Sequence, residues 1–303
     1  MKSISLILVC LFLAPVTFAV NSISTPKRTY AAVAATLDKL AAQYPDQVQA
    51  FILGDSDSGE KIKGVKIGKG AVHHLVVATH HGNEYGSTEV ALGFAAALAA
   101  QPIANQTVFV IPVLNIGGYN TLTRTEVSQT SKKVYDPNRN YPSPCGTEGP
   151  FTLKDTTALS KFIADQNIVA SATLHTFSPA VTYPWGLSTA DLTTGYESIF
   201  KGLVTEATRD SHYHTGNTTE LIYPANGTFE DYAFLTHGIW SLLFELGSSH
   251  NPSPADVAEL IKVNVPGLRR MLESAPTERA AKHAFTGKCD NSRAMHARDL
   301  HDE

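Results

Sequence analysis

The 303-residue sequence lacks an excess of basic residues, is poor in cysteine and contains only one long apolar run. Lysine and arginine number 24 against 28 aspartate and glutamate residues, which gives a formal net charge of −4. This balance excludes the basic stripe expected of a nucleic-acid-binding protein. No apolar run after the first nineteen residues is long enough for a membrane helix, and no repeat or linker divides the chain. We therefore expect one large domain, a monomer that has no membrane span and does not bind nucleic acid.

The single long apolar run lies at the N-terminus. Lys2 gives the chain a positive start, residues 4–13 are apolar, and Thr17 to Ala19 offer small residues for cleavage. This pattern is typical of a signal peptide, and its apolar core is too short to remain as a membrane anchor. We expect residues 1–19 to be the signal peptide of a secreted or periplasmic protein.

Cysteine usage leaves one question open. Of the three cysteines, Cys10 falls inside the expected signal peptide, so Cys145 and Cys289 remain in the mature chain. An even pair in an exported protein permits one disulfide. Two free, unrelated thiols are equally compatible with the sequence.

The spacing of apolar residues predicts alternating helices and strands. Helical spacing is found at 30–44, 88–100, 157–165, 192–209 and 254–274, and apolar strand-like runs at 48–54, 61–68, 74–79, 107–115, 168–174 and 238–246. Near-continuous apolar strands imply a sheet that is covered on both faces. The fold class is therefore α/β: a single-domain α/β/α sandwich over residues 20–275 with a central mixed, mostly parallel sheet. The polar tail at 276–303 is expected to be partly disordered.

Three widely separated segments carry side chains suited to zinc. His81 and Glu84 lie in HHGNEYG, His175 follows an apolar strand, and Glu245 lies in LLFELG. Two imidazoles, one carboxylate ligand and one spare carboxylate are what a water-activating zinc site requires. Each segment alone has a plain structural explanation. However, His81 and His175 both follow strands, and ligands collect at the carboxyl ends of strands in α/β sheets. The sequence predicts a metallohydrolase with one zinc per chain.

Two further motifs, DPNRNY and IYPANGTFEDY, lie in the same chain. With them, the chain from about Thr29 to Leu272 resembles the zinc metallocarboxypeptidases of the carboxypeptidase A and B (funnelin) family. The resemblance implies that His81, Glu84 and His175 bind zinc and that Glu245 is the general base. It leaves no room for the long pro-segment of many relatives, so activation by removal of an inhibitory domain is not expected.

The resemblance also assigns substrate-binding roles. Asn138 and Arg139 in DPNRNY would hold the free C-terminal carboxylate of a peptide substrate, because the planar fork of arginine suits a carboxylate. Tyr223 would close over the same carboxylate. Arg124 would stabilise the developing oxyanion, with Lys132 or Lys133 as alternatives. Together these residues imply a peptidase that acts on free C-termini.

The expected substrate preference depends on the residue in the side-chain pocket. The position seven residues beyond Tyr223 is Glu230, which by resemblance lies in the side-chain pocket. A buried acid favours a cationic partner, so the substrate would end in lysine, arginine or diaminopimelate from cell-wall peptides. In the alternative, Glu230 points to solvent and Phe229 lines a pocket for apolar ends.

One position departs from the family pattern. The family usually has an arginine where this chain has Asn83, and HGNE also resembles the motif of succinylglutamate desuccinylases and aspartoacylases. An acylase-type amidohydrolase is therefore one alternative, and a non-catalytic peptide-binding module is another. The spacing of Tyr223 and Glu245 favours a carboxypeptidase over an acylase. A binding module would be expected to have lost a ligand or the base.

Overall fold

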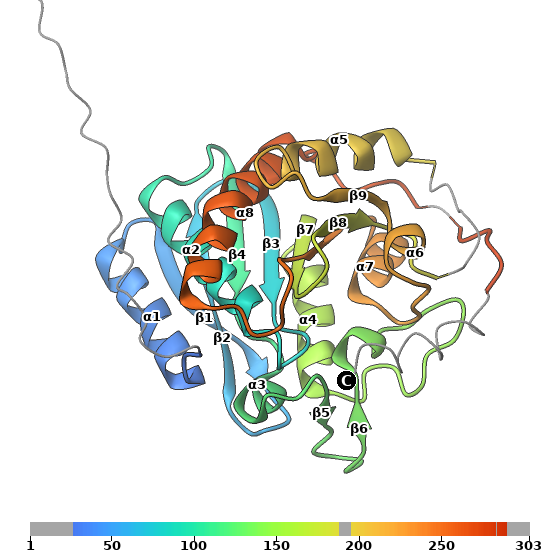
Figure 1. Ribbon diagram of the computed structural model, residues 1–303, viewed down its shortest axis with the longest axis horizontal. Coiled ribbons are helices and arrows are strands. Elements are labelled where there is room, and N and C mark those ends of the chain that lie inside the picture. Colours follow the sequence, from blue (N-terminus) through green and yellow to red (C-terminus); the bar gives the residue numbers. More distant parts are fainter. Residues whose placement is uncertain (1–26, 188–194, 283, 290–303) are drawn as a thin grey trace, which may run out of the picture.

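The computed structural model describes residues 27–187, 195–282 and 284–289 (Figure 1). The elements, in chain order, are α1 (Tyr30–Gln43), β1 (Val48–Asp55), β2 (Lys61–Gly68), β3 (Val72–Ala78), α2 (Tyr85–Ala100), β4 (Gln106–Ile111), α3 (Ile116–Thr121), β5 (Glu126–Val127), β6 (Val134–Tyr135), the 3₁₀ helix η1 (Pro137–Arg139), α4 (Lys154–Asp165), β7 (Ile168–His175), β8 (Ala180–Tyr183), α5 (Glu197–Ala207), β9 (His214–Asn217), α6 (Thr218–Leu221), α7 (Phe229–His237), β10 (Trp240–Glu245) and α8 (Pro254–Ser274).

An eight-stranded sheet forms the centre of the molecule, in the order β1-β2-β4-β3-β7-β10-β8-β9. The four central strands β4, β3, β7 and β10 are parallel, whereas β2 is antiparallel to both of its neighbours, β1 and β4, and β8 is antiparallel to β10. Helices α2, α5 and α8 pack together on one face, and α4 and α7 lie on the other (Figure 1). The α/β class with a mixed sheet is confirmed, and its parallel pairs are the three at the centre and the edge pair β8–β9.

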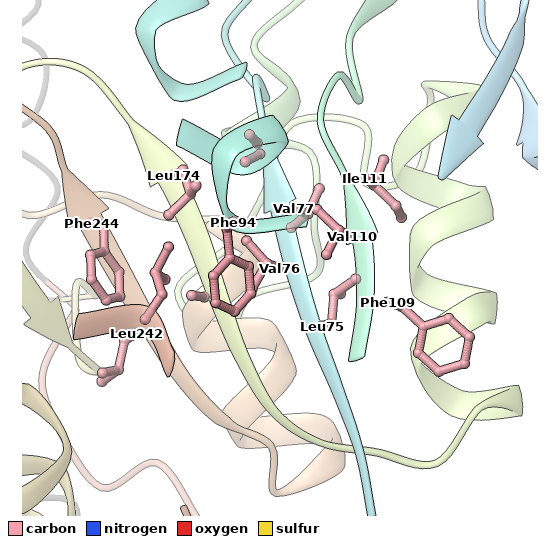
Figure 2. Packing of buried hydrophobic residues seen from close by; sticks show 14 of the residues in the cluster. Leu75, Val76, Val77, Phe94, Phe109, Val110, Ile111, Leu174, Leu242 and Phe244 are labelled. Carbon is pink, nitrogen blue, oxygen red and sulfur yellow. The ribbon is translucent and has the colours of Figure 1, made fainter. Parts of the chain in front are cut away.

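The apolar strand sequences reflect this two-sided cover. Every residue of β7 is buried, and β3 is buried from His74 onward. Phe94 of α2 packs over the sheet beside Val76 and Leu174 (Figure 2). Phe109 of β4 contacts Phe162 of α4, with ring centroids 5.1 Å apart. Because successive strand residues point to opposite faces, strands covered on both sides read as continuous apolar runs.

Hydrogen bonds at the ends of α1 and α8 fix the boundaries of these helices. Thr29 accepts a hydrogen bond from the backbone of Ala32 at the start of α1. Ser253 and Asp256 form a reciprocal capping box at the start of α8. Such caps satisfy amide groups that lack partners within the helix. The expected helices at 30–44 and 254–274 are accordingly present to within one residue.

The C-terminal tail differs from the expectation of disorder over its described part. Arg279 donates to the carbonyl oxygens of Ile163 and Ile168, each at 2.7 Å, and Trp240 donates to the carbonyl of Glu278 at 2.9 Å. A disulfide joins Cys289 to Cys145. The polar composition of the tail gave no sign of this attachment, because the tail is held mainly by hydrogen bonds to backbone groups and by one covalent bond. Residues 290–303 lie outside the described residues.

The expected signal peptide, residues 1–19, also lies outside the described residues. Within the described part of the chain, no helix has both the length and the apolar character needed to cross a membrane.

Candidate active site

A cavity of about 480 Å³ lies at the carboxyl ends of the central parallel strands. His175 and Glu245 end β7 and β10 and are direct partners in the parallel register. His81 follows β3, the other neighbour of β7. All three side chains line the cavity. In the sequence, His175 lies 94 residues after His81 and 70 residues before Glu245. The sheet brings these three residues together.

The three expected metal ligands converge. The Nδ1 atom of His81 lies 2.8 Å from one Glu84 oxygen, and the Nδ1 atom of His175 lies 3.1 Å from the other. The two Nδ1 atoms are 3.2 Å apart, and all three residues are buried. Donor atoms that bind one zinc ion at ~2.0–2.1 Å with tetrahedral angles lie roughly 3.3 Å apart. The donor types and their separations therefore fit a zinc ion with an open coordination position.

The turn that carries His81 and Glu84 depends on a close approach between two backbones. A Cβ atom on Gly82 would lie 1.9 Å from the carbonyl carbon of Gly118 in α3. The backbone of Glu84 donates to the carbonyl of His81 at 3.2 Å, and Glu84 is the residue that directly precedes α2. The chain thus turns within three residues, and both side chains face His175.

Asp136 is a site residue that sequence reasoning did not identify. Its Oδ1 atom lies 3.1 Å from Nε2 of His81, and its Oδ2 atom accepts from Nε of Arg124 at 3.0 Å. Burial raises the pKa of Asp136, but Arg124 and His81 outweigh it and hold the pKa well below its ordinary value. A carboxylate on the outer nitrogen of a ligating histidine fixes the tautomer that leaves the other nitrogen free for the metal. The available signal was its position at the start of DPNRNY.

Arg124 lies beside this cluster. It lines the cavity, and its Nη1 atom is 3.8 Å from a Glu84 oxygen. Lys132 and Lys133, the alternatives considered for its role, are exposed near the tip of the β5–β6 hairpin. The geometry favours Arg124 over either lysine.

Asn138, Arg139 and Tyr223 occupy another part of the cavity wall. The Nη2 atom of Arg139 donates to the Tyr223 hydroxyl at 3.1 Å, and its guanidinium lies 5.7 Å from the centre of the tyrosine ring. The side-chain oxygen of Asn138 accepts from the backbone of Phe229 at 2.8 Å. This bond orients the Asn138 amide on a rigid helix end.

Glu245 lies in an environment that disfavours its charged form. Its Oε2 atom is buried and has no hydrogen-bond partner among the described residues. Burial and then the charge of Glu84 raise the pKa of Glu245 well above its ordinary value, while Arg124 opposes them. A carboxyl with a raised pKa in a cavity is suited to taking up and giving back a proton.

Glu230 is 2% exposed, so it does not point to solvent. The Thr173 hydroxyl donates to one of its oxygens, and Nδ2 of Asn138 lies 3.5 Å from the other. Glu230 itself is not among the residues that line the cavity, whereas Asn138, Thr228 and Leu243 are. Phe229 is fully buried, so the expectation that it might line the pocket is wrong: its ring packs on Tyr141 and His80 instead.

A family model described as zinc carboxypeptidase matches residues 33–266 of this chain. The chain belongs to the zinc carboxypeptidase family. Family members use a catalytic zinc, and the converging His81, Glu84 and His175 provide the ligand set for it here. This zinc carboxypeptidase is 28% identical over 251 residues to carboxypeptidase B of Astacus astacus, which covers 69% of this chain and 82% of the relative. It is 26% identical over 257 residues to human carboxypeptidase B, covering 71% of this chain and 61% of the human protein.

Solved structures share the fold of this zinc carboxypeptidase. Bovine thrombin-activatable fibrinolysis inhibitor, solved in complex with a tick carboxypeptidase inhibitor, superposes with a TM-score of 0.75 at 19% identity, over 82% of this chain and 96% of that one. Carboxypeptidase A from Helicoverpa armigera gives a TM-score of 0.74 at 18% identity, over 82% and 73%. These likenesses concern the arrangement of the sheet and its flanking helices.

Proposed function

We propose that this protein is a zinc-dependent exopeptidase that removes the C-terminal residue of peptides. The observation that carries the proposal is the hydrogen-bonded pair of Arg139 and Tyr223 in the same cavity as the cluster of metal ligands. A guanidinium at a fixed distance from the reacting centre selects a substrate by its terminal carboxylate. That arrangement favours cleavage of the last peptide bond over an internal one.

The proposed chemistry divides between the metal and the side chains of the chain. When bound, zinc supplies Lewis-acid polarisation of the scissile carbonyl and lowers the pKa of water. Glu245 takes the proton from the attacking water and returns it to the leaving amine. Arg124 places a fixed positive charge where the carbonyl oxygen becomes negative. Asp136 keeps both His81 and Arg124 oriented for these roles.

Asn138, Arg139 and Tyr223 would hold the substrate. The guanidinium of Arg139 binds a carboxylate through two parallel hydrogen bonds, and the Tyr223 hydroxyl, now bonded to Arg139, can turn toward the same carboxylate. Binding at this end orients the scissile bond against the metal site. Binding of a terminal carboxylate by these three residues favours a carboxypeptidase over the acylase-type alternative, which was considered because of Asn83.

The first experiment compares peptides with a free C-terminus and the same peptides with an amidated C-terminus. Mass spectrometry should show loss of the last residue from the free acids and at least hundredfold slower cleavage of the amides. The Glu245→Gln variant should keep zinc but lose turnover, because an amide cannot accept the proton. Equal rates on acids and amides would contradict the exopeptidase proposal.

For specificity, we propose a preference for peptides that end in lysine, arginine or diaminopimelate. Support comes from the burial of Glu230, whose hydrogen-bond partners among the described residues are uncharged groups of Thr173 and Asn138, and from the position of Asn138 in the cavity lining. A cationic side chain that reaches it gains a charge-assisted bond. Such peptides should be cleaved at least tenfold faster than matched peptides ending in leucine, a difference of about 1.4 kcal/mol.

The matched variants for this preference are Glu230→Gln and Glu230→Leu. The glutamine variant keeps the shape and hydrogen-bonding capacity but removes the charge, so it should lose the preference for basic ends. If wild-type enzyme already prefers leucine, the basic-end proposal fails and the exopeptidase proposal stands.

We also propose export through the N-terminal segment 1–19. The proposal rests on the positive start, apolar core and small residues of that segment. N-terminal sequencing of protein recovered outside the cytoplasm should begin near Val20. An intact N-terminus on protein retained inside the cell would contradict it.

A further inference from the structure

The Cys145–Cys289 disulfide connects the tail to the substrate side of the cavity. It joins two cysteines that are 144 residues apart, with Cα atoms at 5.3 Å. One cysteine lies in the segment 140–153, here called the Cys145 loop, which directly follows Asn138 and Arg139. The other is the last described residue of the tail.

The tail is anchored independently of this bond. Trp240 and Arg279 hydrogen-bond between the tail and the sheet, and the amide of Ala280 donates to the carbonyl of Gly238 at 2.7 Å. Further along, the ring of Phe285 packs against Trp185, with centroids 5.5 Å apart. The tail therefore gives the disulfide a fixed end.

The Cys145 loop itself has little regular structure. No helix or strand lies between the end of η1 and the start of α4, a stretch that is described throughout, and Pro144, Gly146 and residues 148–150 are exposed. Asn140 closes the loop on itself through bonds to Gly149 and Leu153. These bonds tie the loop at its base, and the disulfide ties it at its middle.

The Cys145 loop supports the segment 222–228, here called the tyrosine loop, which carries Tyr223. Nδ2 of Asn226 donates to the carbonyl of Cys145 at 3.3 Å, and the amide of Tyr141 donates to the carbonyl of Gly227 at 3.0 Å. A Cβ atom on Gly227 would lie 2.7 Å from the Arg139 carbonyl oxygen. The two loops are thus in backbone contact beside the Arg139–Tyr223 pair.

We propose that the Cys145–Cys289 disulfide is a positioning element for the carboxylate-binding side of the site. It holds the Cys145 loop against the tyrosine loop, and so keeps Arg139 and Tyr223 preorganised for a peptide C-terminus. The metal ligands and Glu245 are set by β3, β7 and β10, which the disulfide does not touch. Removing the bond should therefore weaken substrate binding and spare the chemical step. The kinetic part of this inference rests on the proposed carboxypeptidase function.

The test uses the full mature chain in which Cys145→Ser and Cys289→Ser are combined, so that no free thiol can bind zinc. KM for peptides with a free C-terminus should rise at least fivefold, while kcat stays within twofold and zinc content is unchanged. Hydrogen exchange of backbone amides in residues 223–228 should become at least tenfold faster. Asn226→Ala, which keeps the disulfide but removes the bond to the Cys145 carbonyl, should raise KM in the same direction by about twofold.

Arg279→Ala is the matched control, because it loosens the tail at the sheet and leaves both loops intact. It should lower thermal stability without changing KM. The positioning role would be contradicted by an unchanged KM in the double-serine variant, or by an equal rise in KM for Arg279→Ala. Either result would mean that the disulfide only stabilises the fold in general. If the wild-type protein cleaves no peptide, the proposed function fails, and unchanged exchange in residues 223–228 would then separately overturn the positioning role.

Discussion

At the scale of single residues, Asp136 couples the metal site to the electrostatics of the cavity. One of its oxygens faces the outer nitrogen of His81, and the other holds Arg124. The carboxylate therefore orients a zinc ligand and the cation that would face the substrate carbonyl. The effect of Asp136 on both His81 and Arg124 requires the negative charge of its carboxylate.

Replacing Asp136 with asparagine should lower zinc affinity by about 10- to 100-fold, the usual cost of losing such an outer partner. The amide has nearly the same shape but carries no charge for His81 and Arg124. Competition with a chelator of known affinity measures the change. Asp38→Asn is a suitable control, since Asp38 pairs with Lys63 at the surface. Equal zinc affinity in wild type and Asp136→Asn would show that the contact has no role in metal binding.

His74 is a buried histidine with a different consequence. Its ring nitrogens make no hydrogen bond of good geometry among the described residues, and a weak contact with the backbone of Ala170 only partly opposes the effect of burial on its pKa. Burial, and then the neighbouring charge of His73, lower its pKa from 6.5 to about 4. The unfolded chain therefore takes up a proton at a pH where the folded chain does not.

The stability of the protein should accordingly fall as pH drops from about 6.5 to about 4, by up to roughly 3 kcal/mol from this residue. Above pH 6.5 the histidine is neutral in both states and contributes no pH dependence. His74→Leu should remove this part of the acid sensitivity. Denaturant unfolding of zinc-free wild type and variant at pH 8 and pH 5 measures the difference. Parallel stability losses in both proteins would exclude His74 as the cause.

At the scale of elements, the sequence predicted long segments with regular apolar spacing well and short segments poorly. The helices α1 and α8 have sustained apolar spacing and end close to where the sequence indicated. By contrast, β8 has four residues, and the short β5–β6 hairpin lies between the expected strand at 107–115 and the expected helix at 157–165, where the apolar spacing predicted no element. Such short pairs are stabilised by their neighbours in the sheet or loop, which a local pattern does not contain.

Helix α7 was missed although its signals were present. Thr228 caps its start, and Gly238 ends it in the left-handed conformation with φ of 68°. Both are recognised boundary residues. The apolar run at 238–246, which directly follows the helix, predicts β10 but carries no signal for α7.

The turn between β3 and α2 should tolerate no side chain at Gly82. An added Cβ would collide with the backbone of Gly118, which cannot rotate out of the way as a flexible side chain can. Gly82→Ala should therefore displace His81 and Glu84, with at least a tenfold loss of zinc affinity. Gly202→Ala in α5 is the control, because nothing lies within 4 Å of its Cβ position and the change should stabilise the helix by about 0.5–1 kcal/mol. Normal zinc binding by Gly82→Ala would mean that the turn can move without cost.

At the scale of the whole molecule, the sequence indicated the three candidate metal ligands that the fold brings together, but not the residues that contact and orient them. His81, Glu84 and His175 were identifiable because donor chemistry and strand ends coincided in the sequence. Asp136 was not, since its role depends on a contact across 55 residues. The disulfide stayed undecided for the same reason: whether two distant cysteines meet is a property of the folded chain, and only the three-dimensional structure brings Cys145 and Cys289 together.

The tail should contribute to the stability of the entire domain. Ending the chain at Ala275, with Cys145→Ser to avoid a free thiol, removes the disulfide and the hydrogen bonds that Arg279, Glu278 and Ala280 make with the sheet region. We expect a loss of about 2–5 kcal/mol in the free energy of unfolding, as for other native disulfides. Denaturant titration measures it. An unchanged unfolding midpoint would indicate that the tail is only attached to the surface.

The parallel pairing of β3 with β7 has a consequence for the order of events during folding. Pairing of strands that are far apart in the chain is slow, because a long loop must close before any contact forms. His81 and Glu84 follow β3, and each is more than ninety residues from His175 at the end of β7, so an unfolded chain offers no assembled cluster. We therefore expect zinc to bind the completed sheet and to add its binding energy to the native state. Metal binding should then follow folding and not guide it, and removal of zinc by a chelator should shorten the lifetime of the folded state.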